Sequence, residues 1–257
     1  MFRKVFIRIF FTVFICFYFS CTSINRQVKN EATVLKLDST VVLYEDSLIN
    51  AIIKPYKLSL DSFMNEIIGY SERHLFKANP EGLLNNLIAD IVLFEAEKKC
   101  IETGKTTKVD MALLNNGGLR APIPEGAITV RHIYELMPFE NEIVVLELSA
   151  KDTKELFRFV AQQKGVPLSG ATMSIQKDDS AGNILITGKP IDENRTYFVA
   201  TSDYLANGGD KMNFFSHPLQ KINTNYFIRD AIIHYIKEQN KNKKVIDSKL
   251  DKRIYFE

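Results

Sequence analysis

The sequence holds few of the residues that disulfide frameworks, metal centres and nucleic-acid binding surfaces require. Its 257 residues include three cysteines and four histidines, which leave little for a disulfide-rich scaffold or for a metal centre with several ligands. The 33 lysines and arginines are matched by 31 aspartates and glutamates, and a net charge of +2 spread along the chain does not predict a nucleic-acid partner. With 12 glycines, 8 prolines and 46% hydrophobic residues, the composition excludes collagen-like, disordered and coiled-coil chains and is typical of a globular protein.

The N-terminus has the pattern of an export signal. Basic residues surround an apolar stretch at 5–19, and Ser20 and Cys21 follow it. This order of charge, apolar run and small residue is typical of a secretory signal, and a small residue directly before a cysteine resembles a bacterial lipobox. We therefore predict a signal peptide over 1–20 and a lipidated Cys21 that anchors the exported chain to a bacterial membrane, in the periplasm or at the cell surface. A plain signal peptide and a single transmembrane anchor are the alternatives, although spanning a membrane takes about 20 apolar residues.

Cleavage before Cys21 would change the net charge and the number of free thiols of the chain. The signal contains three basic residues, Arg3, Lys4 and Arg8. Without them 30 basic residues face 31 acidic ones, so the net charge becomes −1 instead of +2. Cys16 would leave with the signal and Cys21 would carry lipid, which leaves Cys100 as a single thiol with no intramolecular disulfide partner. Its place at the end of an apolar helix predicts a buried core residue and not a nucleophile.

Past a polar stretch at 21–45, which we predict to be a tether, strand-like and helix-like apolar patterns alternate over 46–257. This alternation predicts one α/β or α+β layered domain in which helices pack on a sheet. The predicted helices cover 46–64 with a break near Pro55, 79–99 with Asn79 as cap and Pro80 in the first turn, 130–137, 150–163 and 224–238. The predicted strands cover 66–70, 109–114, 142–148, 171–176, 183–187, 196–201 and 253–256.

Two glycine turns follow the ends of predicted strands. The first is Asn116-Gly117-Gly118-Leu119-Arg120, and the second is Asn207-Gly208-Gly209-Asp210. Glycine allows positive φ and lets a ligand approach the backbone amides closely. Arg120 suits a phosphate because a guanidinium can donate two parallel charge-assisted hydrogen bonds, and Asp210 could accept a hydrogen bond from a sugar hydroxyl. A turn with no ligand is the alternative at both places, while two such turns at strand ends favour a shared crevice.

Four motifs follow one another along the chain. They are Asn86-Leu87-Ile88-Ala89-Asp90, Asn116-Gly117-Gly118-Leu119-Arg120, Pro138-Phe139-Glu140-Asn141 and Leu205-Ala206-Asn207-Gly208-Gly209-Asp210. In this order and at these separations they resemble the C-terminal domain of 5′-nucleotidases, over about 66–256. The resemblance implies an α/β domain with a mixed sheet that binds the nucleoside part of a nucleotide and helps to hold its phosphate. It also implies that Arg120 contacts the substrate, with Asn116 and the turn at 207–210 shaping the pocket.

The chain departs from that family in its aromatic residues. Members that hydrolyse purine nucleotides clamp the base between two rings, which the resemblance places at 165–171 and just after the second turn. The first stretch holds no aromatic residue, and Lys211 and Met212 occupy the second place. Because stacking is worth about 1–3 kcal/mol per base, we expect altered base recognition, with Met212 and Phe214 as substitutes. Asp90 and the Pro138-Phe139 pair are predicted to be structural.

The larger departure concerns catalysis. The family's hydrolytic centre is a two-metal site on a separate N-terminal metallophosphoesterase domain, and such a site needs a cluster of Asp, His and Asn ligands. The four histidines of this chain are scattered, without the spacing of such ligands, and we expect each to be solvated or structural. They are His74, His132, His217 and His234. We therefore expect no catalytic residue and no metal or other cofactor in this chain.

Two functions are compatible with this pattern. In the first, the chain is the nucleotide-binding half of a split 5′-nucleotidase, and a separate metallophosphoesterase subunit supplies the divalent metals. In the second, it is a non-catalytic periplasmic binding or scaffold lipoprotein. The missing aromatic rings favour the second function, whereas Arg120 and the two glycine turns favour the first.

Overall fold

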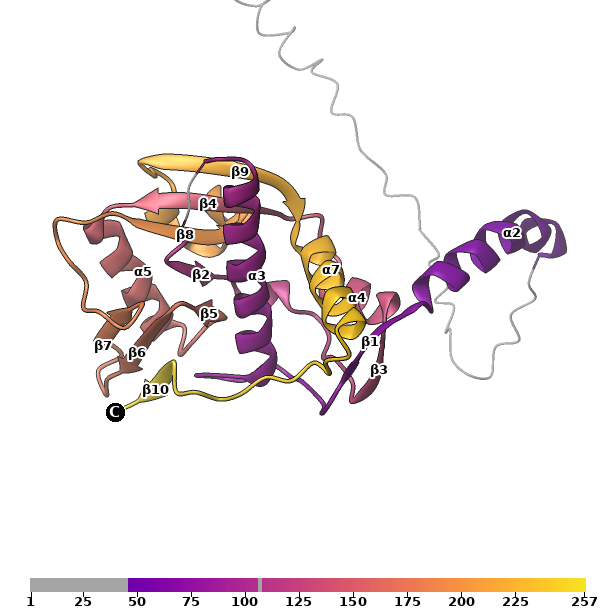
Figure 1. The fold of residues 1–257 in the computed structure, drawn as a ribbon, viewed down its shortest axis with the longest axis horizontal. Coiled ribbons are helices and arrows are strands. Elements are labelled where there is room, and N and C mark those ends of the chain that lie inside the picture. The colour runs from indigo at the N-terminus through magenta and orange to yellow at the C-terminus, as the bar shows by residue number, and fades with distance from the viewer. Residues whose placement is uncertain (1–45, 106–107) are drawn as a thin grey trace, which may run out of the picture. The chain divides into compact units, whose positions relative to one another are not determined.

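The computed structural model describes residues 46–105 and 108–257. The predicted signal peptide, the lipidation site Cys21 and the tether lie outside the described residues. Within them, residues 51–257 form one unit of dense internal contacts, and Figure 1 shows the order of its helices and strands.

A five-stranded mixed sheet lies at the centre of the fold. Its strands are, in spatial order, β5 (Leu168–Ser169), β2 (Met111–Leu113), β8 (Tyr197–Ser202), β4 (Glu142–Leu148) and β9 (Gln220–Phe227). β2 and β8 are parallel, and the other neighbouring pairs are antiparallel. The mixed α/β architecture that the sequence predicted is confirmed.

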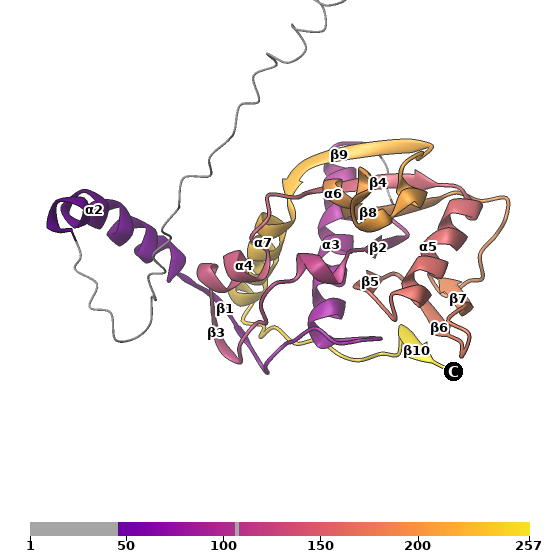
Figure 2. The ribbon, with the colours of Figure 1, turned by 180° about the vertical axis from the view of Figure 1, so that it is seen from behind.

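Both faces of this sheet are buried. Along β4, Ile143 and Val145 join one core, while Val144 and Leu146 join another, as expected when successive side chains point to opposite faces. The first core lies under α3 (Leu83–Glu102), α4 (Val130–Leu136) and α7 (Ile228–Lys241). The second core includes α5 (Ala150–Gln162) and the short helix α6 (Asp203–Ala206), which comes into view in Figure 2.

Two smaller sheets complete the fold. β10 (Ile254–Phe256), β6 (Ala171–Ile175) and β7 (Ala181–Ile186) form one, and β1 (Ile67–Ser71) and β3 (Gly126–Thr129) form the other. Cys100 is buried at the end of α3, as predicted, and its burial raises the pKa of the thiol.

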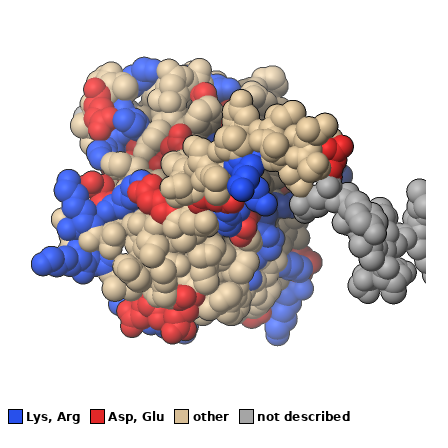
Figure 3. All heavy atoms as spheres, turned by 90° about the vertical axis from the view of Figure 1, so that its right-hand side faces the viewer, with Lys and Arg blue, Asp and Glu red and all other residues tan. Residues whose placement is uncertain are grey.

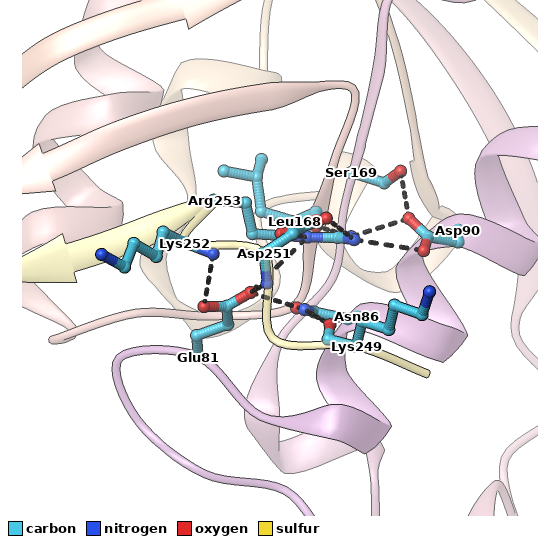
Figure 4. Close-up of polar contacts among 9 residues, drawn as sticks. All are labelled: Glu81, Asn86, Asp90, Leu168, Ser169, Lys249, Asp251, Lys252 and Arg253. Carbon is cyan, nitrogen blue, oxygen red and sulfur yellow. Dashed lines mark hydrogen bonds and ion pairs between the residues drawn. The ribbon is translucent and has the colours of Figure 1, made fainter. Parts of the chain in front are cut away.

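A buried arginine fastens the C-terminal segment to the domain (Figure 4). The guanidinium of Arg253 donates two hydrogen bonds to Asp90 of α3, at 2.7 and 3.2 Å, and two to Asp251, at 2.9 and 2.8 Å. It also donates to the carbonyl of Leu168 in β5 at 3.0 Å. Glu81, just before α3, accepts hydrogen bonds from the amides of Asp251 and Lys252. The arginine therefore joins α3, the central sheet and the last strand.

The structure corrects three predicted helix limits. α2 (Ser47–Met64) is continuous although Pro55, which has no backbone N–H to donate, lies inside it. α3 begins at Leu83 instead of Asn79, because Gly82 just before it is extended, with φ −138° and ψ 150°. α7 begins at Ile228 instead of Thr224, because pairing with β4 keeps the preceding residues in β9.

Most of the apolar side chains of α2 are exposed in the part of the chain that the structure describes. None of its residues is buried. Its exposed large apolar side chains are Leu48, Ile49, Ile52, Ile53, Tyr56, Leu58, Leu60 and Phe63. Asp61, near the helix end, pairs with Arg131 of α4 at 2.9 Å. No helix within the described ranges is both long and apolar enough to cross a membrane.

Basic and acidic side chains are interspersed on the face of the molecule that Figure 3 presents. That face therefore lacks the continuous basic surface on which binding to nucleic-acid phosphates depends.

Candidate nucleotide-binding site

A lysine side chain donates hydrogen bonds to two backbone carbonyls of the first glycine turn. The turn, η1 (Asn116–Gly118), follows β2, and Lys77 donates hydrogen bonds to the carbonyls of Asn116 and Leu119, at 3.2 and 2.9 Å. The amide of Arg120 donates to the carbonyl of Leu136 at 2.8 Å. The Arg120 side chain is exposed, and among the described residues no carboxylate forms an ion pair with it. The Arg120 guanidinium donates to the carbonyl of Gly117 at 3.4 Å and is accessible to an anion.

The two asparagines at this turn have different surroundings. The Asn116 amide accepts a hydrogen bond from the buried Asn85 at 2.8 Å and donates to the carbonyl of Gly165 at 3.0 Å, so its polar groups are engaged beneath the turn. Asn115, which the sequence analysis did not single out, instead donates to Asp210 at 2.5 Å. A side chain on Gly118 would place its Cβ 2.9 Å from the Asn115 amide oxygen, so the Asn115 side chain would have to move.

The second turn brings an acidic and an aromatic side chain to the first. Gly208 has a φ of 88° and Asp210 a φ of 51°, both in the left-handed region. This geometry places the Asp210 carboxylate within reach of Asn115 and of the Tyr204 hydroxyl, which donates to it at 2.9 Å. Asn207 faces elsewhere and accepts from Lys221 at 3.3 Å. The two glycine turns, 95 residues apart at the Asn115–Asp210 contact, therefore meet as the sequence predicted.

One pocket of about 320 Å³ lies where the turns meet. Its lining is Asn115, Gly117, Gly118, Arg120, Phe139, Asn141, Tyr204 and Asp210. The exposed fractions of Phe139 and Tyr204 are 42% and 47%, so both rings are accessible to a ligand. A guanidinium, a carboxylate and two aromatic rings thus line the same pocket.

The aromatic residues correct the sequence analysis. We expected the pocket to lack its stacking rings and Phe139 to be a packing residue, yet Phe139 and Tyr204 both line the pocket. The rings are supplied just before β4 and in α6, and not by the segments where they were sought. The cue was present in the sequence: each ring belongs to or adjoins a motif that carried the family resemblance.

Met212 and Phe214 lie outside this pocket. Met212 is fully buried and lines a neighbouring pocket of about 350 Å³ that shares Asn115, Gly117 and Asp210 with the first. Phe214 packs edge-on against Phe159, with ring centroids 5.6 Å apart, beside a third pocket of about 380 Å³. Neither side chain substitutes for a ring in the pocket of Arg120.

The family of the chain follows from comparison with known proteins. The family model described as "5'-nucleotidase, C-terminal domain" matches residues 67–217. The chain belongs to this family. Protein UshA of Escherichia coli (strain K12) is 29% identical over 140 residues, which are 52% of this chain and 25% of UshA. A 5′-nucleotidase of Diplobatis ommata is 24% identical over 255 residues, which are 89% of this chain and 43% of that protein.

Solved structures agree on this 5′-nucleotidase C-terminal fold. The crystal structure of a 5′-nucleotidase precursor from Thermus thermophilus matches with a TM-score of 0.67 and 27% identity, covering 82% of this chain and 43% of that chain. NAD nucleotidase of Haemophilus influenzae matches with a TM-score of 0.62 at 18% identity, over 82% of this chain and 41% of its own. The chain spans less than half the length of these relatives.

No metal centre is present in the part of the 5′-nucleotidase C-terminal domain that the structure describes, since no three His, Cys, Asp or Glu side chains gather there as ligands. Two of the histidines have structural partners. His132 accepts a hydrogen bond from the amide of Thr129 and completes the cap of α4, and His234 lies 3.0 Å from the buried carboxylate of Glu95.

Proposed function

We propose that this chain binds nucleoside 5′-phosphates as the nucleotide-holding part of a 5′-nucleotidase. One observation carries the proposal: a single pocket joins the Arg120 guanidinium, two accessible aromatic rings and the Asp210 carboxylate. Arg120 pairs with the phosphate, Phe139 and Tyr204 stack on the base, and Asp210 accepts hydrogen bonds from the sugar.

The chemistry of each group fits its part of a nucleotide. A guanidinium donates two parallel hydrogen bonds to a phosphate, and such charge-assisted bonds are about twice as strong as neutral ones. Stacking on an aromatic ring contributes about 1–3 kcal/mol per base and tolerates different bases. These contacts bind and orient the substrate, which is the main task of a protein in phosphoryl chemistry.

Hydrolysis is assigned to a separate metallophosphoesterase subunit. That subunit would hold the divalent metals that activate water and stabilise the leaving oxygen, while this chain presents the phosphate on Arg120. The exposed apolar side chains of α2 support such a partner, because monomeric soluble proteins rarely expose large contiguous apolar patches. The 5′-nucleotidase relatives are more than twice as long as their match to this chain, which is consistent with a further domain or subunit in the working enzyme.

The signal-like N-terminus supports export of the chain. The basic residues, the apolar run and Cys21 favour a lipid anchor on a bacterial membrane, and a relative of similar fold is itself described as a precursor. A lipid-anchored domain of this kind would meet nucleotides in the periplasm or outside the cell.

Calorimetric titration of the full chain with nucleoside 5′-monophosphates tests the proposal. We expect saturable binding by the wild type and an affinity at least tenfold lower for Arg120→Ala, because the phosphate loses its charged donor. Arg158→Ala is the matched control: Arg158 is exposed, pairs with Glu155 on its own helix among the described residues and lies outside the pocket of Arg120, so the affinity of this variant should equal that of the wild type.

Two results would count against the proposal. If the wild type does not bind nucleotides, or if Arg120→Ala binds them equally well, the assignment of the pocket to nucleotides is wrong. The scaffold lipoprotein would then be favoured. Phosphate release by the purified chain with Mg²⁺, Mn²⁺ or Zn²⁺, in a preparation free of other phosphatases, would remove the need for a metallophosphoesterase partner.

A further inference from the structure

Both oxygens of the Asp210 carboxylate are held by side chains from different elements. The Tyr204 hydroxyl, in α6, donates to Oδ1 at 2.9 Å, and the Asn115 amide, at the end of β2, donates to Oδ2 at 2.5 Å. An ionised carboxylate offers about four lone-pair sites, so two sites remain for a ligand. Asp210 is exposed, and without these two donors its side chain could rotate freely.

The position of the Tyr204 hydroxyl is fixed by the backbone beneath its ring. A Cβ on Gly209 would lie 2.5 Å from Cε1 and 2.6 Å from Cζ of Tyr204, distances that no real side chain tolerates. The ring therefore packs directly against Gly209, next to Asp210. The same tyrosine offers its ring to the pocket and its hydroxyl to the carboxylate.

The hydroxyl is a donor at neutral pH. Its hydrogen bond to Asp210 raises the pKa of Tyr204 above the ordinary tyrosine value of 10.0. The tyrosine is therefore protonated and the carboxylate accepts.

We propose that the Tyr204 hydroxyl makes the pocket select ribose over 2′-deoxyribose, by fixing the plane of the Asp210 carboxylate. This inference rests on the proposed function, since it requires a nucleotide in the pocket. A pair of neighbouring sugar hydroxyls donates to a carboxylate in two places at once, which requires a fixed carboxylate plane. The two anchored oxygens provide that plane, and a 2′-deoxy sugar leaves one of the two free sites unused. Tyr204 is in this respect a positioning residue that acts through Asp210.

Calorimetric titration of the full chain with the four ribonucleoside 5′-monophosphates and their 2′-deoxy counterparts tests the inference. We expect the wild type to prefer the ribose member of a pair by about fivefold or more, since one hydrogen bond is typically worth that factor. Tyr204→Phe keeps the ring and removes only the hydroxyl. We expect it to lower the preference to about twofold or less, with the larger loss of affinity on the ribonucleotides, because a 2′-deoxy sugar makes only one of the two hydrogen bonds to Asp210.

Two further variants isolate the hydroxyl. Tyr70→Phe is the control, because Tyr70 is exposed on β1 outside the pocket and its removal should preserve the ribose preference. Asp210→Asn should also lose the preference, and adding Tyr204→Phe to it should change nothing more.

The outcomes separate this inference from the proposed function. An unchanged ribose preference in Tyr204→Phe, no preference in the wild type, or an equal loss of affinity for both sugars overturns the inference while nucleotide binding stands. Failure of every nucleotide to bind the wild type overturns both together.

Discussion

At the scale of single residues, neighbouring side chains at the first glycine turn perform different tasks. Asn115 reaches across to Asp210, whereas the Asn116 amide is engaged by Asn85 and Gly165. The sequence motif contains both asparagines and does not show which of them lines the pocket of Arg120. That choice depends on the backbone direction where β2 ends.

These two positions give a matched pair of substitutions. Asn116→Ala leaves the buried Asn85 amide without its acceptor, and an unsatisfied buried group costs about 1–3 kcal/mol. We expect the free energy of unfolding to fall by about 2 kcal/mol in Asn116→Ala and by less than about 0.5 kcal/mol in Asn115→Ala. Urea denaturation measures both values. An equal loss of unfolding free energy in the two variants would show that Asn116 does not stabilise the turn more than Asn115 does.

At the scale of elements, the pattern of apolar residues predicted most strands and helices to within two residues. Two helix starts were wrong. α3 begins late because Gly82 just before it is extended, and α7 begins late because pairing with β4 keeps 220–227 in strand β9. The helical apolar pattern at 224–238 cannot report a strand partner that lies at 142–147.

The hydrogen bonds of Arg253 should contribute measurably to the stability of the fold. Replacing Arg253 with Met removes its five side-chain hydrogen bonds to Asp90, Asp251 and Leu168. Because the carboxylates are half exposed, with side-chain exposures of 48% and 52%, solvent recovers part of the loss. We expect the free energy of unfolding at pH 7 to fall by about 2 kcal/mol, measured by urea denaturation, against less than about 0.5 kcal/mol for Arg158→Met.

The same contact has a defined pH dependence. The hydrogen bond from Arg253 holds the pKa of Asp251 below the ordinary value of 3.8. Its stabilisation is therefore complete above that value and is lost as the pH falls through the lowered pKa. The difference in the free energy of unfolding between the wild type and Arg253→Met should decrease in acid. A difference that increases in acid would contradict this role.

At the scale of the whole molecule, the sequence predicted the layered α/β fold and the meeting of the two glycine turns. It did not predict which rings enter the pocket, because Phe139 and Tyr204 come from segments 65 residues apart that only the folded sheet brings together. We propose that the pocket in the described residues binds a nucleotide and that the chemistry that acts on the nucleotide lies on another subunit.

The crystal structure of the chain with a bound nucleoside 5′-monophosphate tests the central claim most directly. The account predicts the base between Phe139 and Tyr204, the phosphate on Arg120 and the sugar hydroxyls on Asp210. A nucleotide bound instead against Phe159 and Phe214, in the pocket of about 380 Å³, would contradict it.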